Sequence, residues 1–580
     1  MARKEARERV SRTSAWRTAW LRICMAPKRT VPRAEGGKST LLRYASPRRG
    51  KVATTEGEET DGGGEEEAWS PSTHLMPPPP PRRPSAKEAS TSLFEVQETG
   101  ERNQFEDDVF YLLSGAHAAK PAVRRSSLVQ LTALCATKKA GRMMRATGTL
   151  EKVMECAFKN GWEDEVIALQ AAALLFVLAQ DPANVPKLSS SEAMTCLFEL
   201  FIQPASGPQT KLLSDRNSRT VLEQTQKMFR VGGTLENTLH QHGLVEEVRI
   251  SAPLLAVHVL ESCTRAPESE SALIVVEQFK ATFCQRDGLE ALVVLVDQLV
   301  QSLVAAKEGG ERPLQVLECL MVSLQVLENI TFLNEQGIRM LLALEFDSST
   351  SMGSLRRAPC VQACLVWLRY LSASIEEECK LSVLALKSML ALLVNLTNGS
   401  EEGCRQVARF DGLEAIGSTL LRLLESSAPS EEVSDTTNMA LCLLINLVEK
   451  DEENRKTIAR LTLHGEPLVR RLCRLVGPTG PLPTDYESED EVTEEMLQKN
   501  ERDGMRAMAQ TYAALLLSFL VLGSAEVRQD VDIHLEGGLS SLPTLLHRLH
   551  QFHSSTHSMT AENMSTITDL IHTLQGQELS

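Results

Sequence analysis

One phrase recurs along the chain: an apolar helical stretch that closes on an asparagine and is followed by polar residues. It reads LENIT at 327–331, LVNLT at 393–397 and LINLV at 444–448. A second phrase, DGLEA, stands at 287–291 and again at 411–415, with the looser GGLSS at 537–541. Phrases that alternate in this way are typical of helical repeats, whose single units cannot bury their own apolar faces. They predict an extended binding surface.

The remaining patterns agree with an all-α chain. Aromatic residues make up only 4% of the sequence, which favours helices packed through Leu, Val and Ala over sheets. Helical periodicity predicts helices that include 122–137, 168–179, 254–263, 289–303, 314–327, 364–371, 380–396 and 505–522. We expect the stretches 168–179 and 380–396 to lie inside the stack, because they are apolar almost all round. The predicted fold is a HEAT/armadillo-like helical-repeat solenoid preceded by a disordered N-terminal arm.

Residues 1–103 form this arm. Residues 1–50 hold fourteen Lys and Arg against three acids, a net charge of about +11, and residues 51–70 are acidic. Five prolines follow at 77–81. Such composition predicts disorder. The helical-repeat domain is expected at 104–578, with an acidic, proline-containing loop inserted at about 477–503.

The sequence offers little for chemistry. The phosphate-loop-like GGKST at 36–40 has Pro32 where the motif needs a glycine, and the histidines near the C-terminus lack companions for a metal site. We therefore expect no enzyme, no catalytic residue, no cofactor and no metal. The net charge of −15 argues against a nucleic-acid-binding protein as a whole, and no apolar run is long enough to span a membrane. Thirteen scattered cysteines suggest a reducing compartment.

The repeated asparagines allow two interpretations. Each amide can bond a neighbouring helix, or Asn395 and Asn446 can line a concave face and grip the backbone of a partner. Their uneven spacing, 66 residues from Asn329 to Asn395 and then 51 to Asn446, weakens an evenly spaced ladder.

Longer strings resemble one family. FEDDVFYLLSG at 105–115 is similar to the motif that opens the helical domain of the wings apart-like (WAPL) family. MRATG at 144–148, LVNLTN at 393–398, LLINLVE at 443–449 and YAALLLSFL at 512–520 follow in the order found in that family. The resemblance covers roughly residues 105–575.

This resemblance implies a non-catalytic regulator of cohesin that promotes cohesin release from chromatin, with effects on sister-chromatid cohesion and chromosome segregation. The implied partners are the SMC ATPase head, the kleisin and the HEAT-repeat subunits of cohesin, in the nucleus on chromatin. It implies no membrane, no small-molecule substrate and no sequence-specific contact with nucleic acid. The alternative is a generic armadillo-type adaptor unrelated to cohesin.

The resemblance also suggests partner-binding residues. Asp107 and Asp108 match the paired acids of the opening motif, although acids are also expected in the first turn of a helix. In the arm, a short aromatic-basic motif resembles the one by which family members hook their HEAT-repeat partner; its residues are Arg43, Tyr44, Arg48 and Arg49.

Overall fold

The computed structural model is helical almost throughout its described part. It describes residues 93–137, 139–159, 164–205, 215–229, 250–267, 270–308, 313–347, 357–375, 379–426, 430–463, 465–477, 494–556 and 561–578. The described residues from Arg102 onward belong to one unit. The predicted all-α class is confirmed for these residues.

The first helices form an N-terminal group. They are α3 (Leu93–Ala116), α4 (Pro121–Cys135), α5 (Ala140–Thr147), α6 (Leu150–Lys159), α7 (Glu165–Ala179), η1 (Pro182–Asn184), α8 (Val185–Leu188), α9 (Ser191–Phe201), α10 (Arg216–Phe229) and α12 (Ala252–Thr264).

Repeats of three helices follow. They comprise α13 (Glu270–Gln285), α14 (Gly288–Glu308) and α15 (Leu314–Thr331); α16 (Glu335–Ala343), α17 (Cys360–Ala373) and α18 (Lys380–Thr397); α19 (Glu401–Arg409), α20 (Gly412–Glu425) and α21 (Glu431–Val448); and α22 (Glu452–Ala459), α23 (Leu468–Val476) and α24 (Glu494–Gly523). Helices α25 (Ala525–His534), α26 (Ser541–Thr556) and α27 (Ala561–Glu578) end the fold.

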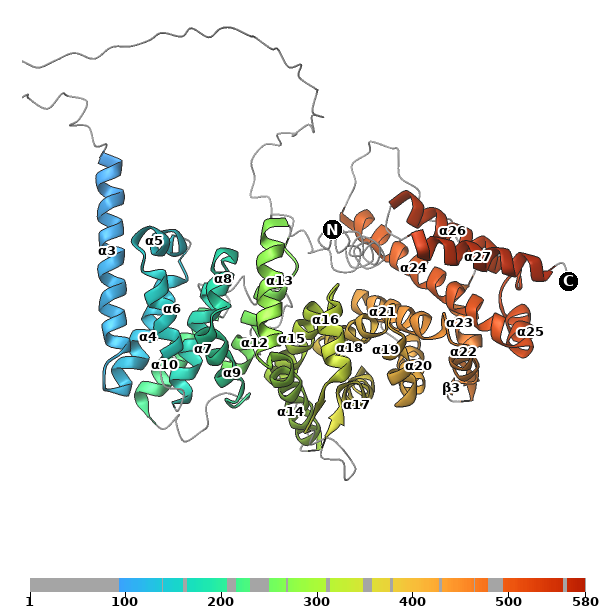
Figure 1. Cartoon of the computed structure of the whole chain (residues 1–580), viewed down its shortest axis with the longest axis horizontal. Coiled ribbons are helices and arrows are strands. Elements are labelled where there is room, and N and C mark those ends of the chain that lie inside the picture. The colour runs from blue at the N-terminus through green and yellow to red at the C-terminus, as the bar shows by residue number, and fades with distance from the viewer. Residues whose placement is uncertain are drawn as a thin grey trace, which may run out of the picture. The chain divides into compact units, whose positions relative to one another are not determined.

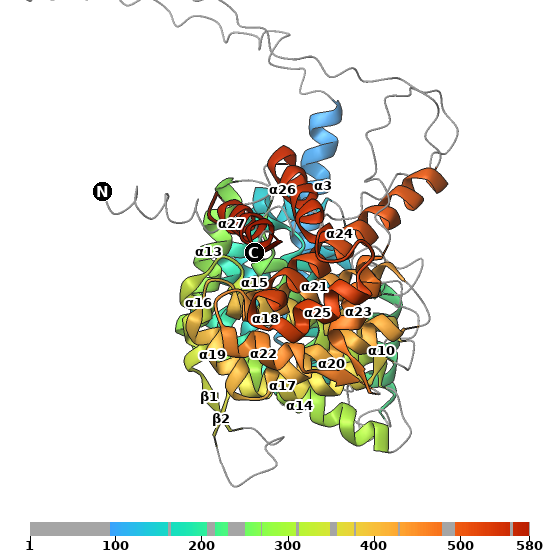
Figure 2. The same cartoon turned by 90° about the vertical axis from the view of Figure 1, so that its right-hand side faces the viewer.

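The third helix of each repeat lies in one continuous row. Helices α7, α12, α15, α18, α21 and α24 contact one another in that order, and α9, α14, α17, α20 and α23 form a second row against them. In Figure 1 the helices of both rows run from left to right in chain order. Figure 2 shows α14, α17 and α20 below α15, α18 and α21. The apolar faces that no single repeat can bury are therefore covered by the next repeat.

Helix α18 shows why the central row is so apolar. It contacts α15 on one side, α21 on the other and α17 from the second row. Of its span, 83% is buried inside the fold, although its length and hydropathy alone would suit a membrane crossing. By the same two criteria α14 and α24 also qualify, with half or more of their spans buried. For α18 the expectation from sequence that it lies centrally is confirmed.

The Asp-Gly-Leu phrase is a tight turn between the first and second helix of a repeat. Asp287 and Asp411 have φ values of 58° and 57°, in the left-handed region that aspartate tolerates better than most residues. Gly288 and Gly412 then begin α14 and α20. A Cβ on Gly412 would lie 2.5 Å from the Val407 carbonyl oxygen, so only glycine lets the two helices approach this closely.

The recurring asparagines connect neighbouring central helices. Asn395 Nδ2 donates to the Glu328 carbonyl oxygen and to Thr331 Oγ1, both at 3.1 Å, at the end of the preceding central helix. Asn446 Nδ2 donates to Thr397 Oγ1 at 3.2 Å. Asn329 repeats the bond to Thr264 Oγ1 at 3.3 Å. The first of the two interpretations from sequence, a bond to a neighbouring helix, thus describes all three.

The hydroxyl oxygen of each threonine is placed to accept the hydrogen bond from the asparagine. The hydroxyls of Thr264, Thr331 and Thr397 donate to carbonyl oxygens four residues earlier in their own helices, at 2.8 to 2.9 Å. The hydroxyl hydrogen is used within the helix, so the oxygen lone pairs remain for the asparagine of the next repeat. These hydrogen bonds align the C-terminal ends of α12, α15, α18 and α21 with one another.

Several boundaries differ from those expected. Helix α3 begins at Leu93, so residues 93–103 are helical rather than part of the arm. Helix α24 begins at Glu494 inside the expected acidic loop, where acids suit a helix N-terminus; residues 478–493 of that loop are outside the described residues. Two two-residue ribbons, β1 (Glu345–Phe346) with β2 (Ala358–Pro359) and β3 (Thr462–Leu463) with β4 (Glu466–Pro467), were not expected.

The asparagine bonds predict a graded effect on stability. Asn395→Ala should lower the free energy of unfolding by about 2 kcal/mol, because it removes two hydrogen bonds from a buried site. Asn446→Ala removes one bond from a half-buried site and should cost under about 1 kcal/mol. Urea unfolding of the two variants measures this, and equal losses would contradict it.

Candidate functional site: the exposed face of helix α3

One face of α3 presents the paired acids of the opening motif. Asp107 and Asp108 are exposed, and the Tyr111 side chain is 78% exposed. Gln104 Nε2 donates to Asp108 Oδ1 at 3.0 Å, four residues apart. Because residues three and four apart share a helix face, Gln104, Asp108 and Tyr111 form one stripe with Asp107 beside it.

The opposite face fixes α3 to the fold through apolar side chains. This face is buried in the second half of α3, from residue 105 to residue 116; the residues are Phe105, Val109, Leu112, Leu113 and Ala116. Gly115 lies directly against Ser127 of α4, where a Cβ would come within 2.1 Å of the Ser127 hydroxyl oxygen. A larger residue at position 115 would displace the Ser127 side chain, so Gly115 lets α3 and α4 pack closely here.

The position of the two acids within α3 excludes the helix dipole as the reason for their presence. Asp107 and Asp108 lie in the second half of a 24-residue helix, not in its first turn. The helix dipole acts only within the first and last turns, so it does not explain the pair. The expectation that these acids open the helix was wrong, because α3 extends N-terminally of the motif.

An aromatic ring borders the acidic pair. Phe110 is 40% exposed, and the Lys152 ammonium of α6 lies 4.3 Å from its ring centroid, a cation–π contact. Phe110 and Tyr111 were part of the recognised string, but their exposure was missed: the sequence alone does not show which face of a helix is covered.

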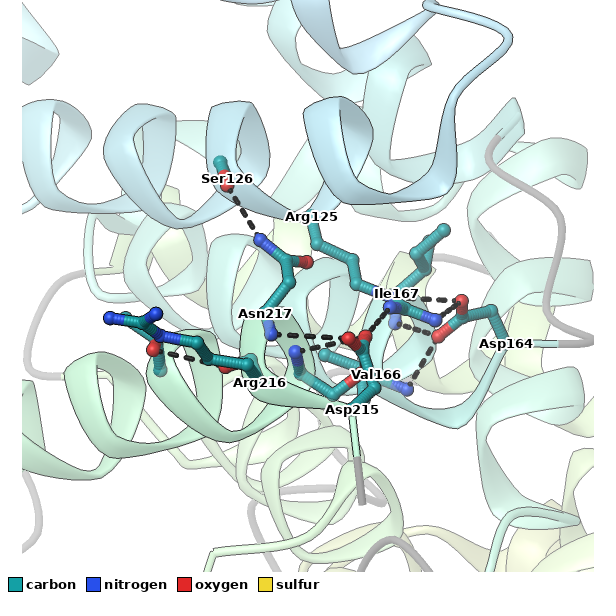
Figure 3. A network of polar contacts seen from close by, with 10 residues as sticks. Arg125, Ser126, Asp164, Val166, Ile167, Asp215, Arg216 and Asn217 are labelled. Atoms are coloured by element: carbon teal, nitrogen blue, oxygen red, sulfur yellow. Dashed lines mark hydrogen bonds and ion pairs between the residues drawn. The ribbon is translucent and has the colours of Figure 1, made fainter. Parts of the chain in front are cut away.

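A buried arginine holds the bundle behind α3. Figure 3 shows Arg125 of α4 between two aspartates that begin other helices. Arg125 Nε donates to Asp164 Oδ2 at 3.0 Å, a second guanidinium nitrogen contacts the same oxygen, and Nη1 donates to Asp215 Oδ2 at 2.9 Å. Asp164 caps α7 and Asp215 precedes α10, so one side chain ties together the starts of two helices.

The two aspartates are satisfied by further bonds. Asp164 Oδ1 accepts the backbone N–H groups of Val166 and Ile167 at 3.0 and 3.2 Å. The hydroxyl and backbone N–H of Ser218, and to a smaller extent Arg125, hold the pKa of the Asp215 carboxyl below its usual range. Asn217 Nδ2 donates to Ser126 Oγ at 3.2 Å and closes the contact with α4. The network is structural and keeps α4, which carries α3, in place.

A second polar cluster lies between central helices. Burial raises the pKa of the Glu328 carboxyl on α15 to about 7, opposed by the Lys387 charge and a hydrogen bond with Ser388. Lys387 Nζ donates to Asp435 Oδ2 of α21 at 2.5 Å, and burial raises the pKa of Asp435 as well. One ammonium thus serves two carboxyl groups. This cluster could not be predicted from the sequence, since its members are far apart along the chain.

Asn395 and Asn446, which were also expected from sequence to bind a partner, lie in the central row on α18 and α21. Asn395 is buried and Asn446 half-buried, and both use Nδ2 in the bonds between central helices described above. A role in holding a partner stays a prediction for both. Arg43, Tyr44, Arg48 and Arg49 lie outside the described residues.

Metal-binding clusters are absent from the part of the chain that the structure describes: no three or more His, Cys, Asp or Glu there can hold a metal ion. His553 is 3% exposed, and burial lowers the pKa of its imidazole to about 4. The described cysteines are all free thiols.

The stacked three-helix repeats define an armadillo-like helical-repeat protein. The sequence model of a family described as "Wings apart-like protein regulation of heterochromatin" matches residues 91–454. That is more than half of the chain. The chain belongs to the wings apart-like family.

Proteins that are named as wings apart-like are similar to the chain in sequence. The chain is 27% identical to the human Wings apart-like protein homolog over 397 residues, which cover 63% of this chain and 30% of the human one. It is 26% identical to the Drosophila melanogaster Protein wings apart-like over 392 residues, 64% of this chain and 21% of that one. It is 21% identical to the Caenorhabditis elegans Wings apart-like protein homolog 1 over 376 residues, 64% and 46% of the two chains. The chain therefore spans less than half the length of these relatives.

Similarity to solved structures adds little. A structure titled for a phosphorylation switch between cadherin and beta-catenin covers 80% of this chain and 83% of its own, with 15% identity and a TM-score of 0.33. So low a score does not support a shared arrangement.

The Arg125 network predicts a position-specific loss of stability. Arg125→Met keeps much of the volume but leaves Asp164 without its buried cation, and should lower the free energy of unfolding by about 3 kcal/mol. Arg145→Met breaks the exposed pair with Asp181 and should cost under about 1 kcal/mol. Thermal unfolding of the two variants measures both losses of stability. Equal effects would show that burial of Arg125 contributes nothing.

The Glu328 carboxyl predicts a pH dependence. Its pKa is about 7 in the folded state and about 4.5 when exposed, so the folded state holds the proton more tightly. Stability from this group is complete below pH 4.5 and is lost as the pH rises through 7. Glu328→Gln should therefore stabilise the protein by roughly 3 kcal/mol at pH 8 and change little at pH 4.5. Urea unfolding at the two pH values measures this; a pH-independent difference would contradict it.

Proposed function

We propose that this protein is a non-catalytic regulator of the cohesin complex that promotes release of cohesin from chromatin and so affects sister-chromatid cohesion and chromosome segregation. Family membership supports the regulatory class. The observation that carries the proposal is the exposed pair Asp107 and Asp108 beside Tyr111, on a helix fixed by Gly115. The motif that links the chain to the family is thus also displayed on the surface.

The face of α3 suits a basic partner surface. Two carboxylates attract cations and orient the encounter, while exposed aromatic rings supply contact area that becomes desolvated on binding. We propose that the partner is the SMC ATPase head, the kleisin or a HEAT-repeat subunit of cohesin, met in the nucleus on chromatin. Asp107 and Asp108 belong at the edge of the contact, with Tyr111 nearer its centre.

Release needs no chemistry by this protein. A rigid scaffold that binds the open form of a cohesin gate more tightly than the closed form shifts the population toward opening by that difference alone. A preference of about 1.4 kcal/mol changes the ratio tenfold. The continuous central row provides the rigidity, because each helix is held by its neighbours on both sides.

A generic armadillo-type adaptor is the second candidate. It would bind an extended peptide along a groove centred on Asn329, Asn395 and Asn446. The bonds of these amides to threonines of the preceding helix favour it less, since peptide binding would have to replace them.

The test reverses the charge of the α3 face. Asp107→Lys with Asp108→Lys should reduce co-purification with cohesin subunits at least about tenfold and lengthen the chromatin residence of cohesin, because like charges now oppose the basic partner. The matched control is Glu401→Lys with Glu414→Lys, two exposed acids on α19 and α20. Residence measured by photobleaching should be normal for the control. Normal residence and normal co-purification for the α3 variant would overturn the proposal.

A further inference from the structure

The ring of Phe110 on α3 carries a cation that comes from another helix. The Lys152 ammonium of α6 lies 4.3 Å from the ring centroid, and Phe110 is 40% exposed. Lys152 is itself exposed and pairs with no carboxylate within the described part of the chain. Because an exposed ammonium keeps most of its hydration, little besides the ring holds this cation in place.

Two unpaired acids flank the ring. Glu106 and Asp107 precede Phe110 by four and three residues, and side chains at these spacings are neighbours on one helix face. Asp107 is exposed and Glu106 is half-buried, and neither carboxylate forms an ion pair or a hydrogen bond with any described residue. Asp108 differs, because it accepts a hydrogen bond from the Gln104 amide. We call Glu106, Asp107 and Phe110 the α3 cation site.

Two other cation–π contacts among the described residues lack these features. Arg455 lies 5.8 Å from the ring centroid of Phe519, which is buried, and the same guanidinium donates to two backbone carbonyl oxygens. Arg409 lies 5.5 Å from the ring centroid of Phe410, which is half-buried and has no acid three or four residues before it. The α3 cation site combines an accessible ring with free carboxylates, so a cation from outside can reach it.

We propose that the α3 cation site binds an arginine side chain of the partner, which displaces Lys152 from the Phe110 ring. The inference rests on the proposed function only in taking this face of α3 as the partner-binding face. A guanidinium is planar and more weakly hydrated than an ammonium, so it stacks better on an aromatic ring. Its N–H groups can at the same time donate to the carboxylates of Glu106 and Asp107.

Lys152 acts as an internal competitor for the site. While its ammonium lies on the ring, an incoming cation has to replace it, and this exchange offsets part of what the new contact contributes to binding. The exchange breaks no ion pair, because Lys152 has none within the described part of the chain. Loss of this one charge, by substitution or by acetylation of the lysine, should therefore strengthen binding of the partner.

The surroundings of the site favour a macromolecular partner over a free cation. Tyr111, next to Phe110, is 78% exposed, and Val123 of α4 is 42% exposed. Val123 lies close to α3, since a Cβ on Gly115 would be 3.9 Å from its Cγ1. These side chains offer apolar contact area that a protein surface can cover and a hydrated ion cannot use. In the described part of the chain no group of three His, Cys, Asp or Glu can hold a metal ion.

Binding of a fluorescein-labelled peptide to the full-length chain, followed by fluorescence anisotropy, tests the proposal. The probe is a short glycine–serine peptide with two arginines, and the comparison peptide has lysines in place of the arginines. The arginine peptide should bind about threefold more tightly than the lysine peptide. Phe110→Leu should weaken binding of the arginine peptide about threefold and remove most of its advantage over the lysine peptide, because the ring is lost.

Lys152→Gln should give a gain of affinity. Binding of the arginine peptide should become about threefold tighter than in the control Lys159→Gln, because the ring is vacated. Lys159 is exposed on the same helix, two turns further along, and pairs with Glu155 at 2.9 Å. The control therefore removes the same charge without vacating a ring. Phe110→Leu combined with Lys152→Gln should abolish the gain.

Equal affinity for the two peptides, a gain in Lys152→Gln no larger than in the control, or no binding of the arginine peptide would overturn the proposal. Matching thermal unfolding curves exclude misfolding as a cause. If Phe110→Leu unfolds at a lower temperature, the comparison of Lys152→Gln with its control decides alone, since it changes only exposed side chains.

The proposed function is judged separately, through recovery of cohesin with the Asp107→Lys and Asp108→Lys variant. Peptide binding as predicted, together with normal recovery of cohesin, would support the α3 cation site and contradict the proposed function. Reduced recovery of cohesin, with peptide affinities that do not respond to Phe110→Leu or Lys152→Gln, would contradict the site and leave the proposed function standing.

Discussion

The structure depends on the lateral contact between third helices of successive repeats. Helix α18 is buried on nearly every side and is covered by α15, α17 and α21 together. Apolar packing has no direction, so it does not by itself fix how far one helix slides along the next. The Asn395 bonds to α15 and the Asn446 bond to Thr397 supply that register. An Asn–Thr pair between α12 and α15, α15 and α18, and α18 and α21 thus makes the apolar packing of these helices specific.

The surface follows from this arrangement. Helices α7 and α12 of the N-terminal group are buried almost all round, whereas α3 buries one apolar face and leaves the other to solvent. Gly115 and Ser127 set the crossing of α3 with α4, and Arg125 ties α4 to the starts of α7 and α10. The acidic face of α3 is therefore held by a rigid support, as a site for partners requires.

Much of the fold could be predicted from the sequence because its signals are local. The periodicity of residues 380–396 and the Asp-Gly-Leu turns state which face is apolar and where a helix must turn sharply. The family strings locate Asp107 and Asp108 as well. Long-range pairings were not predictable: Asn395 meets Thr331, Lys387 meets Asp435 and Arg125 meets Asp215 across 48 to 90 residues of sequence. Nor did the sequence show that α3 begins at Leu93, since polar residues 93–104 lack an apolar stripe.

The central claim is that this armadillo-like stack is an interaction scaffold of the wings apart-like kind that acts on cohesin. The most direct test is affinity purification of the tagged full-length chain from nuclear extract, with the bound subunits identified by mass spectrometry. The account predicts recovery of an SMC ATPase, a kleisin and a HEAT-repeat subunit in comparable amounts. Recovery of unrelated cargo or cytoskeletal proteins without any cohesin subunit would contradict it.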